Sequence, residues 1–286
     1  MSRSRRSLAA ALDARFVSTS TRFPSAPRFN GDPTDTERFP LNEPTVFPKI
    51  FANTPAIRKW FTPLKSNESF HGLNVSYLSQ HGSAMVPLEL TRYNTSEPDG
   101  RQRTSFERFE APLSLLLAQM SQPDNSLDLY LAQCPLDLLP SELRADLPHA
   151  PSMLSHIGRG DIYASSLWMG RPPTITPLHR DPNPNLFIQL AGRKVIRLMR
   201  PEQGRALYDQ SRSDKGHAHM RGEEMMVGEE MERLQEAVWN DSSSYPMGGV
   251  EAELESGHAL FIPQGWWHAV QGYGPGANAS VNWWFR

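Results

Sequence analysis

The chain has 286 residues, of which 38% are hydrophobic and 21% are charged, and its formal net charge is -2 at pH 7. This composition excludes collagen-like, intrinsically disordered and membrane-spanning proteins, and the near-neutral charge provides no general attraction to nucleic acid or to a membrane. The single cysteine, Cys134, excludes an internal disulfide and a CxxC-type zinc site. We therefore expect a soluble protein with one large core.

Residues 1–35 form a basic, serine-rich leader. Its first 30 residues contain six arginines and one acidic residue, Asp13, while Leu8, Leu12 and Phe16 recur at helical spacing. This pattern favours a mitochondrial transit peptide, and a basic disordered tail is the alternative. The first interpretation predicts a mitochondrial protein, and the second predicts a cytoplasmic or nuclear one.

The sequence has a globular texture from Pro44 onward, so we assign residues 44–286 to one domain after a Pro-rich and charge-rich linker. Its first half predicts a short helix, a strand, an apolar helix and two further strands, over residues 55–61, 84–93, 111–120, 128–136 and 161–170.

The second half predicts a hairpin over residues 186–199 that turns near Gly192. A polar insertion follows over residues 201–250, and its second half places Met231, Leu234 and Val238 on one helical face. Two apolar strands close the chain, over residues 259–270 and 279–286. Short strands with Gly and Pro turns predict a mainly β protein, a small barrel or a double-sheet jelly roll with surrounding helices, and not a doubly wound α/β domain.

Three side chains in the apolar strands have the chemistry of metal ligands. His179 and Asp181 are two residues apart, so on an extended strand they point to the same face. A His-x-Asp pair alone is more simply a structural or surface pair. His268, in the distant apolar stretch FIPQGWWHAV, completes a set of two imidazoles and one carboxylate. That set suits non-haem Fe(II) and leaves three cis positions open for a chelating cosubstrate and dioxygen.

Lys194 is the second unusual residue. Along KVIRLM it shares a face with Ile196 and Leu198, which predicts that it points into the core. A buried ammonium without a partner costs several kcal/mol, so an inward lysine implies an anion that meets it. We expect that anion to be a ligand carboxylate. A lysine that extends to solvent from an edge strand is the alternative.

Together the segments TPLHRDPNPNLFIQLAGRKVIRL, ESGHALFIPQGWWHAV and ASVNWWFR resemble the JmjC-type (cupin-like) 2-oxoglutarate oxygenases. Their pattern is closest to that of the asparaginyl hydroxylase that inhibits hypoxia-inducible factor. The resemblance runs from Pro44 to the C-terminus. It implies a double-stranded β-helix, Fe(II) as metal, 2-oxoglutarate and dioxygen as cosubstrates, and hydroxylation of a protein side chain.

The resemblance also implies roles for eight residues. The metal ligands fall on His179, Asp181 and His268. Residues that bind the distal carboxylate of 2-oxoglutarate fall on Lys194 and Thr176, with help from Tyr130. Two asparagines near the iron-side carboxylate fall on Asn185 and Asn282. Strand parity places Asn185 on the face of Asp181, but it does not bring Thr176 or Tyr130 inward.

The sequence departs from the family at two places. Asp181 stands where many histone lysine demethylases have glutamate, which favours hydroxylation. The chain ends at Arg286, so the helical extension that dimerises the asparaginyl hydroxylase is not expected. Elsewhere, His217 and His219 read as a solvated loop rather than a second metal site. Three tryptophans are candidates to line the pocket, although core packing is the simpler reading for each of them: Trp168, Trp267 and Trp284.

Three other functions stay open. One is hydroxylation of a modified tRNA base, for which the near-neutral charge speaks against a nucleic-acid partner. Another is a cupin-type metal isomerase or sugar-binding protein, which has no need of an inward Lys194. The third is a catalytically silent scaffold, against which the intact triad argues.

Overall fold

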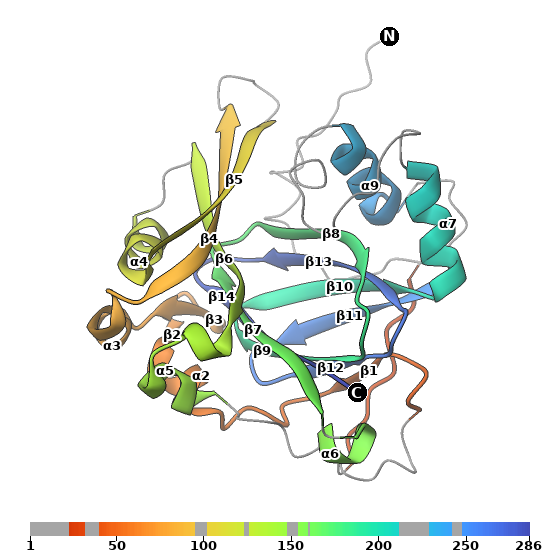
Figure 1. The fold of residues 1–286 in the computed structure, drawn as a ribbon, viewed down its shortest axis with the longest axis horizontal. Coiled ribbons are helices and arrows are strands. Elements are labelled where there is room, and N and C mark those ends of the chain that lie inside the picture. The colour runs from red at the N-terminus through yellow and green to blue at the C-terminus, as the bar shows by residue number, and fades with distance from the viewer. Residues whose placement is uncertain are drawn as a thin grey trace.

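The computed structural model of this chain describes residues 23–31, 40–94, 102–122, 126–147, 154–159, 161–211, 229–241 and 248–286. Two antiparallel sheets lie face to face, and helices pack around them (Figure 1). From β7 to β14 the chain passes repeatedly from one sheet to the other. The expectation of a mainly β jelly roll with surrounding helices is therefore confirmed.

The larger sheet has eight strands in the order β1-β12-β9-β14-β7-β6-β4-β5. Its strands are β1 (Thr45–Phe47), β4 (Met85–Asn94), β5 (Gln102–Pro112), β6 (Leu127–Pro135), β7 (Ile162–Gly170), β9 (Asn185–Ala191), β12 (Ala259–Ile262) and β14 (Asn278–Phe285). The smaller sheet has the order β11-β10-β13-β8, with β8 (Thr174–Arg180), β10 (Arg193–Met199), β11 (Gly249–Glu255) and β13 (Trp267–Tyr273). A separate hairpin consists of β2 (Phe61–Leu64) and β3 (Asn67–Leu73).

Helices cover the outer faces of both sheets (Figure 1). They are α2 (Pro55–Trp60), α3 (Val75–Leu78), α4 (Leu113–Ser121), α5 (Ser141–Asp146), α6 (Leu154–Ile157), α7 (Pro201–Ser211) and α9 (Glu229–Trp239), with short 3-10 turns η1 (Ser79–His81) and η2 (Leu136–Leu138). The predicted helices over 55–61 and 111–120 correspond to α2 and α4. The predicted helical face of Met231, Leu234 and Val238 is buried in α9. No helix among the described residues is long and apolar enough to span a membrane.

The space between the two sheets contains both apolar and polar side chains. An apolar cluster there joins Ile196, Leu198 and Val270 of the smaller sheet to Phe187 and Leu260 of the larger one. The outer face of the larger sheet packs against α2, α4 and α5, and the outer face of the smaller sheet packs against α7 and α9. β9 and β12 are buried along their whole length, so both of their faces are covered, which explains why they read as continuous apolar runs.

The predicted hairpin over residues 186–199 is wrong. β9 pairs with β12 and β14 in the larger sheet, whereas β10 pairs with β11 and β13 in the smaller one. Gly192, at φ 68°, lies where the chain leaves one sheet for the other. A turn that allows positive φ looks the same in sequence whether it joins two paired strands or two sheets.

The apolar stretch 259–270 is likewise not one strand. It divides into β12 and β13, which belong to different sheets, and the residues between them form a turn. β1, β2, β3 and β5 were not predicted, because their sequences lack a clear apolar alternation. β11 was not predicted either, although Val250, Ala252 and Leu254 alternate with glutamates along it.

The described part of the basic leader is built into the barrel. Residues 23–31 run beside the edge strands of both sheets: the amide of Ala26 donates to the carbonyl of Glu251 in β11 at 2.7 Å, and that of Phe29 donates to Val46 in β1 at 2.9 Å. Phe23 is 2% exposed and packs with the cluster beneath α7 and α9. The rest of the leader, residues 1–22 and 32–35, lies outside the described residues, as do His217 and His219.

Truncation should therefore have two different effects. Deleting residues 1–22 removes none of these contacts and should leave the melting temperature unchanged. Deleting residues 1–31 also removes buried Phe23 and Ala26 and the paired backbone, which should destabilise the fold by on the order of 3–6 kcal/mol. Thermal melting of the two purified truncations measures this difference. Equal melting temperatures of the two truncations would show that residues 23–31 contribute nothing to the stability of the fold.

Candidate metal centre and barrel interior

Two strands of the smaller sheet and the loop after β8 assemble the three predicted ligands. His179 in β8 is the direct register partner of His268 in β13, and their ring centroids are 4.1 Å apart. Asp181 follows the end of β8, with Oδ1 3.9 Å from His179 Nε2 and Oδ2 3.6 Å from His268 Nε2. The candidate ligand atoms all lie within 4.8 Å of one another. They are the only such group of three among the residues that the structure describes.

The backbone contacts of both imidazoles favour the tautomer that leaves Nε2 free for a metal. Nδ1 of His179 lies 2.8 Å from the carbonyl oxygen of Pro177, and Nδ1 of His268 lies 3.3 Å from that of Trp266. A carbonyl can only accept, so each Nδ1 carries the proton and each Nε2 keeps its lone pair. Such backbone contacts orient metal-binding histidines. The donor set therefore fits a divalent metal ion.

Asp181 is a buried carboxylate with several partners. Burial raises the pKa of its carboxyl, but the rings of His268 and His179 and two N–H donors lower it further, so the pKa lies below its usual value. The donors are Asn185 Nδ2 at 3.0 Å and Trp284 Nε1 at 2.7 Å, and both bind Oδ2. Asp181 is therefore an ionised candidate ligand at neutral pH.

An asparagine relay begins at this carboxylate. Because Asp181 can only accept, Asn185 must direct its amide nitrogen to it and its oxygen away. That oxygen accepts from Asn282 Nδ2 at 3.0 Å. Asn282 Oδ1 is buried and has no hydrogen-bond partner among the described residues. The carboxylate thus fixes the orientation of both amides.

Lys194 points into the interior, as strand parity predicts. It is 2% exposed, its Nζ donates to Ser280 Oγ of the opposite sheet at 2.7 Å, and it lies 5.2 Å from the ring centroid of Phe187. Its register partner Gly272 is four residues beyond His268 along β13, a separation of about 13 Å. The ammonium and the triad therefore occupy the same interior at different depths.

A β-bulge brings Thr176 inward. Thr176 pairs with Val270 and His179 pairs with His268, so three steps along β8 match two steps along β13. The extra residue lets Thr176 and His179 share the inner face despite their odd separation. Leu178, within the bulge, packs on the outer face. Sequence parity alone could not have shown this.

Tyr130 reaches the same interior from the larger sheet. It pairs with Gly170 of β7, which pairs with Asn278 of β14, so Tyr130 shares the face of Asn278 and Ser280. Its ring centroid is 6.1 Å from that of Trp168.

The three tryptophans have different surroundings. Trp168 is buried on the inner face beside Tyr130. Trp267 packs on the outer face against Tyr208 of α7, with ring centroids 4.9 Å apart. Trp284 faces inward and donates to Asp181. Trp284 therefore contacts the site and does more than pack in the core. It lies two residues after Asn282 on the same face of β14, and this spacing could have indicated its place in the site.

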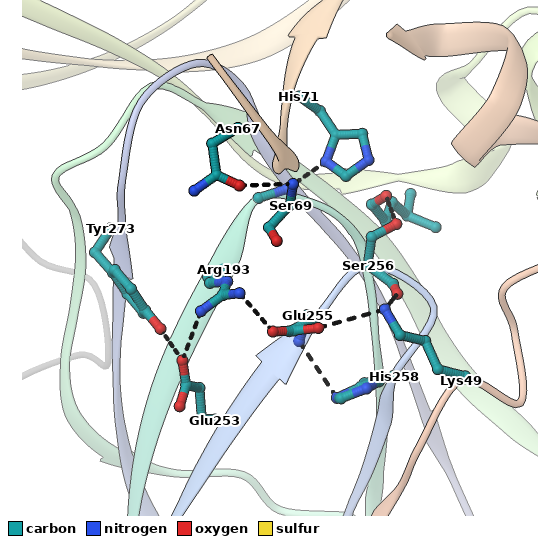
Figure 2. Close-up of polar contacts among 12 residues, drawn as sticks. Lys49, Asn67, Ser69, His71, Arg193, Glu253, Glu255, Ser256, His258 and Tyr273 are labelled. Atoms are coloured by element: carbon teal, nitrogen blue, oxygen red, sulfur yellow. Dashed lines mark hydrogen bonds and ion pairs between the residues drawn. The ribbon is translucent and has the colours of Figure 1, made fainter. Parts of the chain in front are cut away.

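A cavity of about 360 Å³ lies away from the triad, between the β2–β3 hairpin and the end of β11. Its lining residues are Lys49, Ala52, Glu68, Ser69, His71, Glu255 and Ser256. Figure 2 shows the polar network there, in which Lys49 and Arg193 both reach Glu255, at 3.5 and 2.7 Å. Burial and the nearby Lys49 lower the pKa of the adjacent His258 to about 4. None of the predicted site residues lines this cavity, although Lys194 follows Arg193 at the same end of β10.

Comparison with known proteins identifies the family. The family model described as "Cupin-like domain" matches residues 33–286. The chain is 27% identical over 246 residues to lysine-specific demethylase JMJ30 of Arabidopsis thaliana, covering 84% of this chain and 49% of that protein. It is 25% identical to lysine-specific demethylase 8 of Xenopus tropicalis, covering 85% and 48%. It is 24% identical to the human bifunctional peptidase and (3S)-lysyl hydroxylase JMJD7, covering 85% and 77%.

The chain thus spans about half the length of the first two of these relatives. The match agrees with the jelly-roll topology and with the His-Asp-His triad. The resemblance inferred from the sequence is confirmed at this level: the chain belongs to the family of cupin-like JmjC domains.

Proposed function

We propose that this protein is an Fe(II)- and 2-oxoglutarate-dependent dioxygenase that hydroxylates a protein side chain. The observation that carries the proposal is the pairing of two features in one interior. The triad of His179, Asp181 and His268 offers three metal ligands, and the buried ammonium of Lys194 lies deeper between the same two sheets. A molecule with a chelating end and an anionic end matches both features.

JmjC enzymes use Fe(II) and 2-oxoglutarate, and the triad has the ligands for such a metal. We assign the three triad residues as metal ligands and as the catalytic centre. Together, Fe(II), 2-oxoglutarate and dioxygen supply the oxidising power for a substrate C–H bond and yield succinate and carbon dioxide. On this proposal Lys194 and Thr176, with Tyr130, bind the distal carboxylate, and Asn185 and Asn282 border the metal end.

The chain itself contributes orientation and exclusion of water. Pro177 and Trp266 carbonyls orient the imidazoles, while Asn185 and Trp284 orient the carboxylate. The apolar cluster of Ile196, Leu198, Val270, Phe187 and Leu260 surrounds the interior. A dry interior strengthens the contact of an ammonium with an anion, so it favours tight cosubstrate binding.

A protein substrate is supported by the relatives, whose names refer to lysine demethylation and lysyl hydroxylation. Demethylation is the second candidate, because several of these names state it. Both outcomes start from oxidation of a C–H bond. Release of formaldehyde from a methylated substrate separates demethylation from hydroxylation, which leaves a stable product heavier by one oxygen atom.

Two non-protein readings have less support. The net charge of -2 gives no basic field for a tRNA substrate. A metal isomerase or sugar-binding cupin would not require a buried ammonium facing the interior, yet Lys194 is 2% exposed.

The test is succinate production from 2-oxoglutarate by purified, Fe(II)-loaded protein without added substrate. We expect slow turnover that an extract containing the substrate stimulates. Mass spectrometry of the treated extract then identifies proteins that gain one oxygen atom. An absence of succinate both with and without extract would contradict the proposed function and favour the binding-protein reading.

We further propose that the leader directs the protein to mitochondria, as its arginine-rich and acid-poor composition favours. Residues 1–35 fused to a fluorescent protein should carry it to mitochondria. The same fusion with Arg5→Glu and Arg6→Glu should not, because transit peptides tolerate few acidic residues. A diffuse signal from the unaltered fusion would instead support a basic tail.

A further inference from the structure

The two carboxylate oxygens of Asp181 are in different surroundings. Oδ2 accepts hydrogen bonds from Trp284 Nε1 at 2.7 Å and from Asn185 Nδ2 at 3.0 Å. A carboxylate oxygen has two lone-pair directions in its plane, so two N–H donors occupy both directions of Oδ2. Oδ1 lies 3.9 Å from His179 Nε2 and Oδ2 lies 3.6 Å from His268 Nε2, so both oxygens face the imidazoles, but only Oδ2 accepts from the two N–H donors. Oδ1 is therefore the oxygen with lone pairs available for a metal.

The two donors come from the sheet opposite the imidazoles. Trp284 in β14 and Asn185 at the start of β9 are direct register partners in the larger sheet. His179 and His268 belong to the smaller sheet. Residues of the larger sheet thus fix the rotation of the carboxylate, whereas the smaller sheet positions the two imidazoles. Asn185 Oδ1 also accepts a hydrogen bond from Asn282 Nδ2 at 3.0 Å, so the Asn185 side chain cannot rotate freely away from Asp181.

We propose that Trp284 is a positioning residue that, with Asn185, restricts Asp181 to a single metal bond through Oδ1. This inference rests on the proposed function. A six-coordinate metal with three single-atom protein ligands keeps three positions open, as a chelating cosubstrate plus dioxygen requires. If Oδ2 also bound the metal, only two positions would stay open, and the cosubstrate would fill both. The indole N–H would therefore protect the position for dioxygen.

The experiment replaces Trp284 by phenylalanine, which keeps an aromatic ring but removes the N–H donor. Trp283→Phe is the matched control: Trp283 is the next residue in β14, faces the opposite side, and its Nε1 has no hydrogen-bond partner among the described residues. Mn(II) is the probe, without cosubstrate. Its affinity is measured by calorimetry, and the number of exchangeable waters on bound Mn(II) is measured by water-proton relaxation.

We expect about three exchangeable waters in the wild type and in Trp283→Phe, and about two in Trp284→Phe, because the freed Oδ2 replaces one water. Mn(II) affinity in Trp284→Phe should fall about tenfold or more, as is usual when a hydrogen bond to a metal ligand is lost. Asn185→Ala removes the other donor and tests the same point if Trp284→Phe does not fold.

An unchanged number of waters in the Trp284 variant would overturn this inference whatever the affinity, while leaving the proposed function intact. A wild-type protein that binds no Mn(II) would overturn the proposed function, and this inference with it. A loss of waters in Trp283→Phe equal to that in Trp284→Phe would show a general effect of packing and would also overturn the inference.

Discussion

Replacing Asp181 by alanine is expected to abolish divalent metal binding and all succinate production. The variant loses the only carboxylate of the triad, and two imidazoles alone form an incomplete site for Fe(II). His179→Ala should have the same effect. Calorimetric titration with Mn(II) and a succinate assay with Fe(II) measure the two losses.

The fold should survive these substitutions. The core of the barrel is apolar and does not depend on a metal, unlike a zinc finger. Asp181→Ala leaves the N–H groups of Trp284 and Asn185 without their acceptor, so we expect a destabilisation of about 1–3 kcal/mol. Circular dichroism and a melting curve check this.

His71→Ala is the control for the histidine substitution. His71 is also partly buried, but it lies in β3, lines the cavity and is outside the triad. Its replacement should leave metal binding unchanged. Wild-type metal affinity in Asp181→Ala would contradict the assignment of the triad as the metal centre.

Replacing Lys194 by alanine is expected to weaken 2-oxoglutarate binding about 10–100-fold. On our proposal its ammonium meets the distal carboxylate in an interior shielded from water, and such a charge-assisted contact is worth about 1.5–3 kcal/mol. Metal affinity should change little, because Lys194 is not a ligand. Anaerobic titration of the Fe(II)-loaded protein, followed by the charge-transfer absorbance of bound 2-oxoglutarate, measures the change.

Two further variants sharpen this test. Ser280→Ala removes the hydroxyl that accepts from Lys194 but keeps the ammonium itself, so it should weaken 2-oxoglutarate binding less than Lys194→Ala does, by about 2–10-fold. Lys194→Arg keeps the charge, but the longer planar guanidinium does not fit the space beside Phe187 and Ser280, so it should also be impaired. Equal 2-oxoglutarate affinity in wild type and Lys194→Ala would show that the ammonium does not contact the cosubstrate.

Much of the site was predictable because strand periodicity fixes which face a side chain occupies. The spacing of His179 and Asp181 predicted that both would point to one face, and they lie together. The alternation along β10 predicted an inward Lys194, and it is buried. The apolar stripe of α9 was also visible, because a helix repeats every 3.6 residues. These features depend only on residues close in sequence.

The partners of each strand were decided by the tertiary structure. β9 and β10 read as a hairpin, yet β9 pairs with β12 and β14, and β10 pairs with β11 and β13, all of them at least 50 residues further along the chain. Periodicity specifies the two faces of a strand but says nothing about which strand provides its hydrogen bonds. Periodicity likewise gave no indication of the role of residues 23–31, because their contacts are with the distant strands β1 and β11.

The remaining details of the site depend on contacts between distant residues. Thr176 shares the face of His179 only because a bulge shifts the register of β8 against β13. Trp284 binds Asp181 across 103 residues of sequence, through the pairing of β14 with β9. Residue types and strand periodicity thus indicate which side chains carry the chemistry and which way most of them face. Which of them meet depends on the fold, because a hydrogen bond depends on where two separate strands are placed and on their register.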